Sequence, residues 1–303
     1  MKVCIASHVA LDEIIDLDGV KTESLGGPVC YGSLLTKTFS FDAFAATRVG
    51  NDMVEKTQLL RDCNIFLTEN QIDKSKLTTK FRLVLNKEGG RQLFLSSSCS
   101  EISVDDFVDS NAFLVSPIYE EISQATLQKV VDKFRGSFIM IDPQGFLRYK
   151  NKEGLILNRK IIDLDLNGVT AIKADPEELS ALTGGTASIE GMIKIRDKFN
   201  LQFVISTCDN SIIFLHKNIV YTIKFKKIDS PDHTGLGDIL ATGFTCAYLK
   251  ERDPLWAICF GAGSVIASLD SKKKGVQKVP DKMNSIERFA SYFYNTIKFK
   301  VVD

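Results

Sequence analysis

Short apolar runs alternate along the chain with segments of helical length whose apolar residues recur every three or four positions. The runs predict strands, and the longer segments predict amphipathic helices. The expected strands are 3–6, 42–48, 113–116, 138–141, 169–174, 203–206, 212–215 and 220–225, and the expected helices are 28–38, 52–62, 120–134, one from Pro176, 238–250 and 255–269. This alternation indicates an α/β fold in which helices cover both faces of a mostly parallel sheet.

Two segments, 14–25 and 80–95, break that rhythm because polar and apolar residues alternate one by one. A period of two predicts strands with one exposed face. The second segment contains the turn Glu88-Gly89-Gly90. We expect these strands to form a small sheet, inserted as a lid over a ligand crevice. An edge hairpin that extends the main sheet is the alternative.

Length and charge narrow the class of protein. At 303 residues the chain can form one large domain over 1–303, and its 38 basic and 38 acidic residues cancel. This balance predicts no nucleic-acid or membrane partner. The seven cysteines are scattered without a C-x-x-C pair, which disfavours structural zinc and a disulfide framework. Without a signal peptide or a long apolar run, the protein is expected in the cytoplasm.

The most informative segment is Asp232-His-Thr-Gly-Leu-Gly-Asp238, which leads directly into an apolar helix. Gly235 and Gly237 lack Cβ, so their backbone can approach a ligand closely. The first N–H groups of a helix have no internal partner and carry partial positive charge. A carboxylate beside such an anion site is suited to deprotonate a hydroxyl next to a phosphate. Taken alone, the segment also fits an ordinary helix start with Asp238 in its first turn.

Four other groups of residues are candidates for ligand contact, and each has a plain structural alternative. Gly26-Gly27 precedes a helix and either offers amides to hydroxyls or makes a turn. Asp12 follows the first strand, at the end of the sheet where ligands gather in open α/β folds. Asp175 and Glu178 satisfy the rules for a helix start, although Glu178 could also hold Mg²⁺ through water. The polar stretch 206–211 either borders a nucleotide or forms an ordinary turn.

Neither a P-loop nor a G-x-G-x-x-G motif after the first strand is present. Taken in their order along the chain, however, the candidate segments resemble the motifs of the ribokinase-like (PfkB) family of carbohydrate and nucleoside kinases. Segment 232–238 resembles the family's C-terminal signature Asp-Thr-x-Gly-Ala-Gly-Asp, and Gly26-Gly27 and Val49-Gly50-Asn51-Asp52 resemble its N-terminal elements. Segment 174–178 resembles its Asn-x-x-Glu motif, and segment 260–269 with Gly275 and Pro280 resembles its closing helix and loop. Segment 142–148 is most similar to archaeal sugar or myo-inositol kinases. The resemblance implies a three-layer α/β/α sandwich with a small β lid.

The resemblance also implies an ATP-dependent kinase that phosphorylates a hydroxyl of a small sugar or cyclitol. Asp238 would be the base, and the amides of Gly235, Leu236 and Gly237 would stabilise the transferring phosphoryl group. The resemblance further implies that the substrate binds at Asp12, Gly26, Gly27, Tyr31, Asn51, Gln144 and Arg148. The nucleotide would bind at Ser206, Cys208, Ser211, Gly261 and Ser264. Glu178 would hold Mg²⁺ through water, and Asp232 and Thr234 would hold a monovalent cation such as K⁺.

The sequence departs from the family pattern at several of these positions. The departures are His233 for a threonine, Leu236 for an alanine, Asp175 for an asparagine, Cys208 and Ser211 for glycines, and Tyr31 for an asparagine that touches the sugar in ribokinases. A hole made of backbone amides tolerates the first two changes. The altered turn at 208–211 leaves the identity of the donor open, and Tyr31 argues against ribose as the substrate.

Two other functions stay open. A nucleoside kinase of the same family would need an aromatic clamp for the base, for which Tyr31, Phe81 and Phe94 are candidates. A non-catalytic sensor would keep the fold and bind a sugar or nucleotide, which the altered turn favours and the intact Asp238 disfavours. The exposed face of the small sheet also predicts a homodimer that pairs through the lid.

Overall fold

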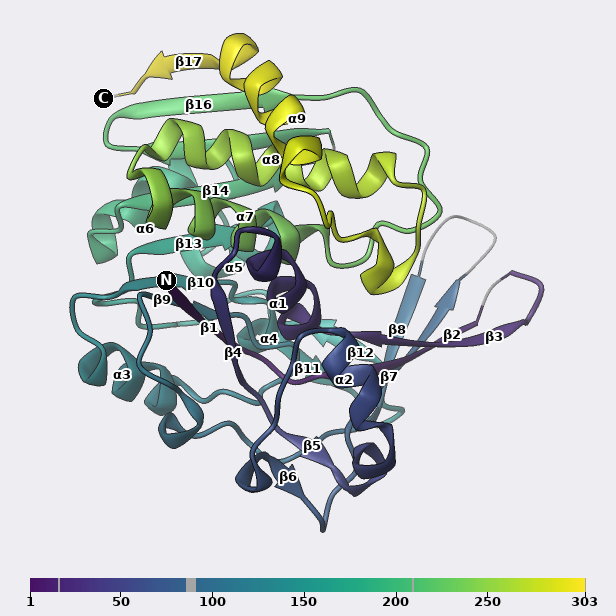
Figure 1. Cartoon of the computed structure of the whole chain (residues 1–303). Helices are drawn as coiled ribbons and strands as arrows, with labels where there is room; N and C mark the ends of the chain where they lie inside the picture. Colours follow the sequence, from purple (N-terminus) through teal and green to yellow (C-terminus); the bar gives the residue numbers. More distant parts are fainter. Residues whose placement is uncertain (16, 86–90, 209, 303) are drawn as a thin grey trace.

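The computed structural model describes residues 1–15, 17–85, 91–208 and 210–302. A nine-stranded sheet forms the centre of the molecule, in the order β17-β16-β15-β14-β13-β10-β9-β1-β4 (Figure 1). Its strands are β1 (Lys2–Ala6), β4 (Asp42–Ala46), β9 (Ala112–Val115), β10 (Phe138–Ile141), β13 (Ala171–Ala174), β14 (Phe203–Cys208), β15 (Ser211–His216), β16 (Ile219–Lys224) and β17 (Lys298–Val301). From β4 to β14 the neighbours run parallel, and β15, β16 and β17 are added antiparallel.

Helices cover both faces of this sheet. One face carries α1 (Pro28–Thr38), α7 (Leu236–Glu251), α8 (Pro254–Asp270) and α9 (Met283–Thr296), and the other carries α3 (Gln124–Lys133), α5 (Pro176–Thr183) and α6 (Ile189–Phe199). Successive side chains of a strand point to opposite faces, so Val3 and Ile5 pack into the first core while Cys4 and Ala6 pack into the second. The predicted mostly parallel sheet between two helical layers is therefore confirmed.

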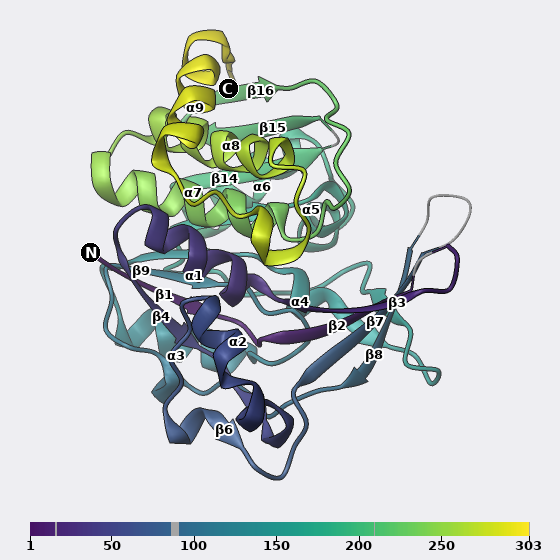
Figure 2. The same cartoon turned by 45° about the vertical axis from the view of Figure 1, so that its right-hand side comes forward.

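A second, four-stranded sheet projects from one side of the molecule, as Figures 1 and 2 both show. We call it the small sheet; its order is β3-β2-β7-β8, with β2 (Ala10–Ile15), β3 (Lys21–Gly26), β7 (Thr79–Leu85) and β8 (Arg91–Ser97). Among the described residues no strand pairs it with the main sheet, so the alternative of an edge hairpin is wrong. Its first strand begins at Ala10 rather than residue 14, and the turn predicted at 88–90 lies outside the described residues.

The remaining elements are short; those over residues 51–62 correspond to the helix expected at 52–62, whereas the sequence pattern did not predict the others. The short elements are β5 (Val49–Gly50), η1 (Asn51–Lys56), α2 (Thr57–Asp62), η2 (Glu69–Gln71), β6 (Ile72–Asp73), η3 (Val104–Asp106), α4 (Gln144–Leu147), β11 (Arg148–Lys150), β12 (Ile156–Asn158) and η4 (Gly275–Lys278). The helix expected from residue 120 begins at Gln124, because the Ser123 hydroxyl accepts the Thr126 N–H and caps it there. Within the described ranges, no helix is both long enough and apolar enough to span a bilayer.

Candidate active site

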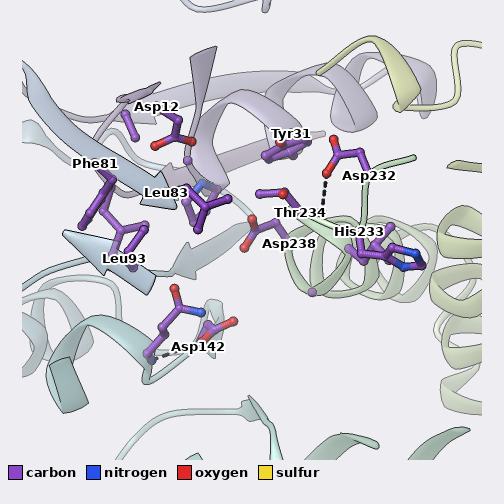
Figure 3. A pocket seen from close by; sticks show the side chains of 18 of the residues that line it. Asp12, Tyr31, Phe81, Leu83, Leu93, Asp142, Asp232, His233, Thr234 and Asp238 are labelled. Carbon is purple, nitrogen blue, oxygen red and sulfur yellow. Dashed lines mark hydrogen bonds between the residues drawn. The ribbon is translucent and has the colours of Figure 1, made fainter. Parts of the chain in front are cut away.

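The carboxyl ends of the parallel strands open into a cavity of about 2550 Å³ that is covered on one side by the small sheet. Its lining includes Asp12, Ser24, Phe81 and Leu93 of the small sheet, Tyr31 of α1, Asp142 and Gln144 after β10, Arg148 of β11, Lys173 of β13, Asp175 and Glu178 at the start of α5, and residues 231–238, 273–277 and 279–281. Figure 3 shows the labelled carboxylates Asp12, Asp142 and Asp238 around one space. A single small-molecule pocket spans roughly 300–1,000 Å³, so this cavity has room for two ligands.

Helix α7 begins at this cavity. Gly235 precedes it with φ of 72°, a left-handed conformation that favours glycine. The Tyr31 ring lies directly against Gly235, since a Cβ there would come within 2.5 Å of a ring carbon. The first intrahelical bond runs from the Ile239 N–H to the Gly235 carbonyl at 3.0 Å. The N–H groups of residues 236–238 therefore have no partner within the helix and lie at the cavity wall.

Asp238 is half-buried, and its carboxylate points into the cavity (Figure 3). Burial raises its pKa to about 7, and the negative charge of Asp142 adds to that effect, which outweighs the attraction of Lys173 and Arg148. A carboxyl group with this pKa can gain and lose a proton near neutral pH. It therefore has the property that a general base needs.

Lys173 is a site residue that the sequence analysis missed. It lies on β13 with 5 % of its surface exposed, and its ammonium forms an ion pair with Asp142 at 2.6 Å. A Cβ on Gly237 would lie 2.9 Å from Lys173 Nζ, which places this charge at the start of α7. Although burial disfavours the charge, Asp142, Glu178 and Asp238 raise the pKa of Lys173 and keep it cationic. A lone lysine within the apolar strand 169–174 was the available signal, because lysine is rarely buried without a partner.

The residues expected to hold the substrate lie mainly at the small-sheet end of the cavity. Asp12 lies beside Gly26, since a Cβ on that glycine would be 2.6 Å from Asp12 Oδ2. Burial raises the pKa of Asp12 to about 6, against the opposing attraction of Arg148. Of the predicted set, Asp12, Gly27, Tyr31, Gln144 and Arg148 line the cavity, whereas Gly26 and Asn51 do not.

The residues expected to contact the nucleotide are placed differently. Gly261 and Ser264 are fully buried in α8; Gly261 packs against α7, and the Ser264 hydroxyl donates to the Phe260 carbonyl at 2.9 Å. These two residues therefore serve helix packing in this structure. Ser206, Cys208 and Ser211 also lie outside the lining, although Thr207 between them is part of it.

The start of α5 contributes two carboxylates to the cavity. They form the expected capping box: the Glu178 N–H donates to Asp175 Oδ1, and the Asp175 N–H donates to Glu178 Oε2, both at 2.8 Å. Burial raises the pKa of Glu178 to about 8, with the charges of Asp142 and Asp175 adding to it and Lys173 opposing it. Nowhere in the described ranges do three His, Cys, Asp or Glu side chains cluster tightly enough to ligate a metal directly. A hydrated Mg²⁺ bound mostly through water and ligand phosphates fits such a pair of carboxylates.

The loop before α7 is fixed by Asp232. Asp232 Oδ1 accepts the Thr234 N–H at 2.8 Å, and Oδ2 accepts the Gly275 N–H at 2.7 Å and the Lys278 ammonium at 2.9 Å. The imidazole of His233 is exposed and points away from the Asp238 carboxylate (Figure 3). Asp232 thus joins the loop to η4, and His233, although it lines the cavity, does not turn its imidazole toward Asp238.

No family model and no curated protein matches the chain. Its fold, however, is that of solved kinases of the ribokinase family. One is a pyrophosphate-dependent kinase in that family, complexed with a pyrophosphate analog and myo-inositol: 20 % identity, 94 % of this chain and 99 % of the other covered, TM-score 0.76. A second is a fructokinase from Vibrio cholerae with fructose, ADP and calcium bound; it has 17 % identity and a TM-score of 0.75, with 95 % of this chain and 98 % of the other covered. A third is a nucleoside kinase from Methanocaldococcus jannaschii; it has 15 % identity and a TM-score of 0.71, with 96 % of this chain and 98 % of the other covered. At these identities the likeness establishes the fold, including the small sheet beside the main one.

Proposed function

We propose that this protein is a kinase that transfers a phosphoryl group to a hydroxyl of a small sugar or cyclitol. The observation that carries the proposal is the arrangement at the start of α7, where unpaired N–H groups, the Lys173 ammonium and the Asp238 carboxylate meet at one cavity wall. Phosphoryl transfer needs positioning and neutralisation of charge more than covalent chemistry. This wall supplies both, together with a base. The ribokinase-like fold supports the same class of reaction.

In the proposed step, Asp238 accepts the proton of the acceptor hydroxyl as its oxygen forms a bond to the terminal phosphorus of the donor. The bond from that phosphorus to the bridging oxygen breaks, and the shortened donor leaves. The N–H groups of residues 236–238 and the Lys173 ammonium stabilise the negative charge on the phosphoryl oxygens. Because Lys173 is held by Asp142 at 2.6 Å, this charge is in place before the reaction begins. A hydrated Mg²⁺ would neutralise the donor phosphates, with Glu178 and Asp175 as the residues that would hold it.

The aromatic residues of the cavity favour a polyol over a nucleoside as acceptor. Among the described residues, Tyr31 and Phe81 are the aromatic side chains of the lining, with 2 % and 4 % of their surface exposed. Tyr31 is covered by Gly235, and Phe81 packs with Leu95 and Ile118. Phe94 lies outside the lining, under the guanidinium of Arg82. A base would therefore find no free ring to stack on, whereas Asp12, Gln144 and Arg148 can bind hydroxyls.

The donor is proposed to be ATP, and inorganic pyrophosphate is the second candidate. The reason for the second candidate is that the residues expected at the nucleotide lie outside the cavity lining, while Lys173, Lys273 and Lys274 line it. Lysines bind phosphates as point charges and need no adenine contact. One of the similar kinases is itself described as pyrophosphate-dependent.

The proposal is tested by incubating the protein and Mg²⁺ with ATP or pyrophosphate and a panel of myo-inositol, hexoses, 2-keto-3-deoxygluconate and nucleosides. Phosphorus NMR should detect a new phosphomonoester of a polyol with one of the donors. A nucleoside as the preferred acceptor would instead identify a nucleoside kinase. Binding without transfer across the whole panel would contradict the proposal and favour the non-catalytic sensor.

A further inference from the structure

A lysine ammonium lies at the place where the family resemblance implies a monovalent cation. Lys278, the last residue of η4, has no exposed side-chain surface. Burying a lysine is costly unless its charge is paired. Its partner is Asp232, and the ion pair at 2.9 Å is made inside the protein, beneath the loop that precedes α7.

The contacts of this ammonium resemble a coordination sphere. Lys278 Nζ lies 2.9 Å from Asp232 Oδ2 and 3.3 Å from the Asp232 carbonyl oxygen. On another side it lies 5.7 Å from the centre of the Tyr31 ring, within the range of a cation–π contact. A carboxylate and a carbonyl oxygen are the groups that a bound K⁺ would use, and the ring of Tyr31 attracts a cation as well. Here one protein cation already uses all three.

The residues present do not fit an additional monovalent cation. A K⁺ ion held by Asp232 would have to share Oδ2 or the carbonyl with an ammonium that is already in contact with both. Two unit charges about 4 Å apart repel by about 4 kcal/mol at an effective dielectric constant of 20. The second oxygen, Oδ1, already accepts the Thr234 N–H at 2.8 Å. The expected K⁺ at Asp232 and Thr234 is therefore not supported by this geometry.

We infer that Lys278 is a built-in substitute for the monovalent cation and makes this protein independent of K⁺. Lys278 is a positioning residue: it joins η4 to Asp232, lies over Tyr31, and Tyr31 in turn packs against Gly235 at the start of α7. Through these contacts it holds the loop that carries the free N–H groups. Its role in turnover rests on the proposed function, whereas its role as the cation of Asp232 does not.

The test compares the melting temperatures of the wild type, Lys278→Met and Lys278→Met/Asp232→Asn in potassium, ammonium and choline chloride at matched ionic strength. Methionine keeps the length of the side chain and removes the charge, which leaves the half-buried Asp232 without a cation. We expect the wild type to melt at the same temperature in all three salts. Lys278→Met should melt about 5 °C or more lower in choline and recover part of that loss in K⁺ or ammonium, because a small cation can enter the vacated site.

The double variant is the matched control for specificity, since without the carboxylate it should show no recovery. Lys198→Met, which breaks the exposed pair with Asp163, controls for the loss of any lysine charge and should respond to no salt. A wild type that needs K⁺ for its stability or turnover would overturn the inference, and so would a Lys278→Met variant that is indifferent to all three cations. If Lys278→Met does not fold, the wild type alone decides by its dependence on K⁺. Because melting is measured without substrate, failure of the proposed kinase activity would leave this result intact.

Discussion

Two acidic residues in the cavity have pKa values near neutral pH, about 7 for Asp238 and about 8 for Glu178. Both lie above the ordinary values of 3.8 and 4.5, so between about pH 4 and pH 8 these two carboxyl groups hold more protons in the folded protein than in the unfolded chain. Their contribution to the free energy of unfolding then falls as the pH rises through this range. A carboxyl group that can exchange a proton near neutral pH, as the proposed base must, therefore lowers the stability of the folded protein at neutral pH.

We predict that Asp238→Asn reduces this dependence on pH. Urea unfolding at pH 5 and pH 8 should show that the wild type loses more stability over this interval than the variant, by about 2 kcal/mol or less. The sign follows from the raised pKa: the Asp238 contribution is present at low pH and is lost as the pH approaches 7. Equal losses in the two proteins would show that Asp238 titrates at its ordinary value.

Replacement of Lys173 tests whether its charge acts on the reaction or only on folding. Lys173→Met should lower turnover by about 100-fold or more and also destabilise the protein, because Asp142 is left buried and unpaired. Lys173→Met/Asp142→Asn removes that unpaired charge and keeps an oxygen for the Gln144 N–H. The double variant should therefore regain stability without regaining turnover, as measured by melting and by initial rates. Recovery of turnover along with stability would reduce Lys173 to a structural role.

At the level of single residues, the sequence predicted the place of Asp238 at a helix start but not the buried lysines Lys173 and Lys278. Asp238 belongs to a contiguous motif, so its place at a helix start could be read directly. Lys173 and Lys278 could not be found in this way, because each acquires its role from a partner 31 or 46 positions away. A lysine in a sequence is ordinarily solvated, and only the packing of the chain reveals that these two are buried.

Among the elements, the start of α7 depends on one glycine. Gly235→Ala would strain a backbone at φ of 72° and drive a methyl group into the Tyr31 ring. We predict a loss of about 2 kcal/mol or more in unfolding free energy and a large fall in turnover, because the loop with its N–H groups must shift. Gly136→Ala is the matched control, since Gly136 has φ of 92° and open space around its Cβ position. Both variants carry backbone strain, so similar turnover in the two would show that contact with Tyr31 is unimportant.

Elements with a clear apolar pattern were predicted best, although two long helices, α6 and α9, were missed. The helix 28–38 and the strand 138–141 have the expected bounds, because several turns or a continuous buried run give a clear pattern. The hairpin of β11 and β12, which carries Arg148 into the cavity, was not predicted, since strands of three residues contain too little periodicity. The C-terminal strand β17 was also missed; its four residues are all exposed, so no buried face marked it.

For the whole molecule, the order of elements along the sequence predicted the layers and the position of the cavity. The carboxyl ends of parallel strands lie at one edge of a sheet, so residues that follow separate strands can line the same cavity. Asp12, Asp142, Glu178 and Asp238 do meet there. The sequence could not show that Gly261 and Ser264 lie between helices, because this depends on how closely α7 and α8 approach. The homodimer through the small sheet stays a prediction.

The central claim is that the cavity transfers a phosphoryl group to a hydroxyl with Asp238 as its base. The most direct measurement is the turnover of Asp238→Asn against the wild type, with whichever donor and acceptor the panel identifies and with donor binding measured by calorimetry. Asparagine keeps the shape of the side chain but cannot accept the proton. The account predicts turnover lower by about 10³-fold or more, with folding and donor binding close to those of the wild type. Turnover within a few-fold of the wild type would contradict it.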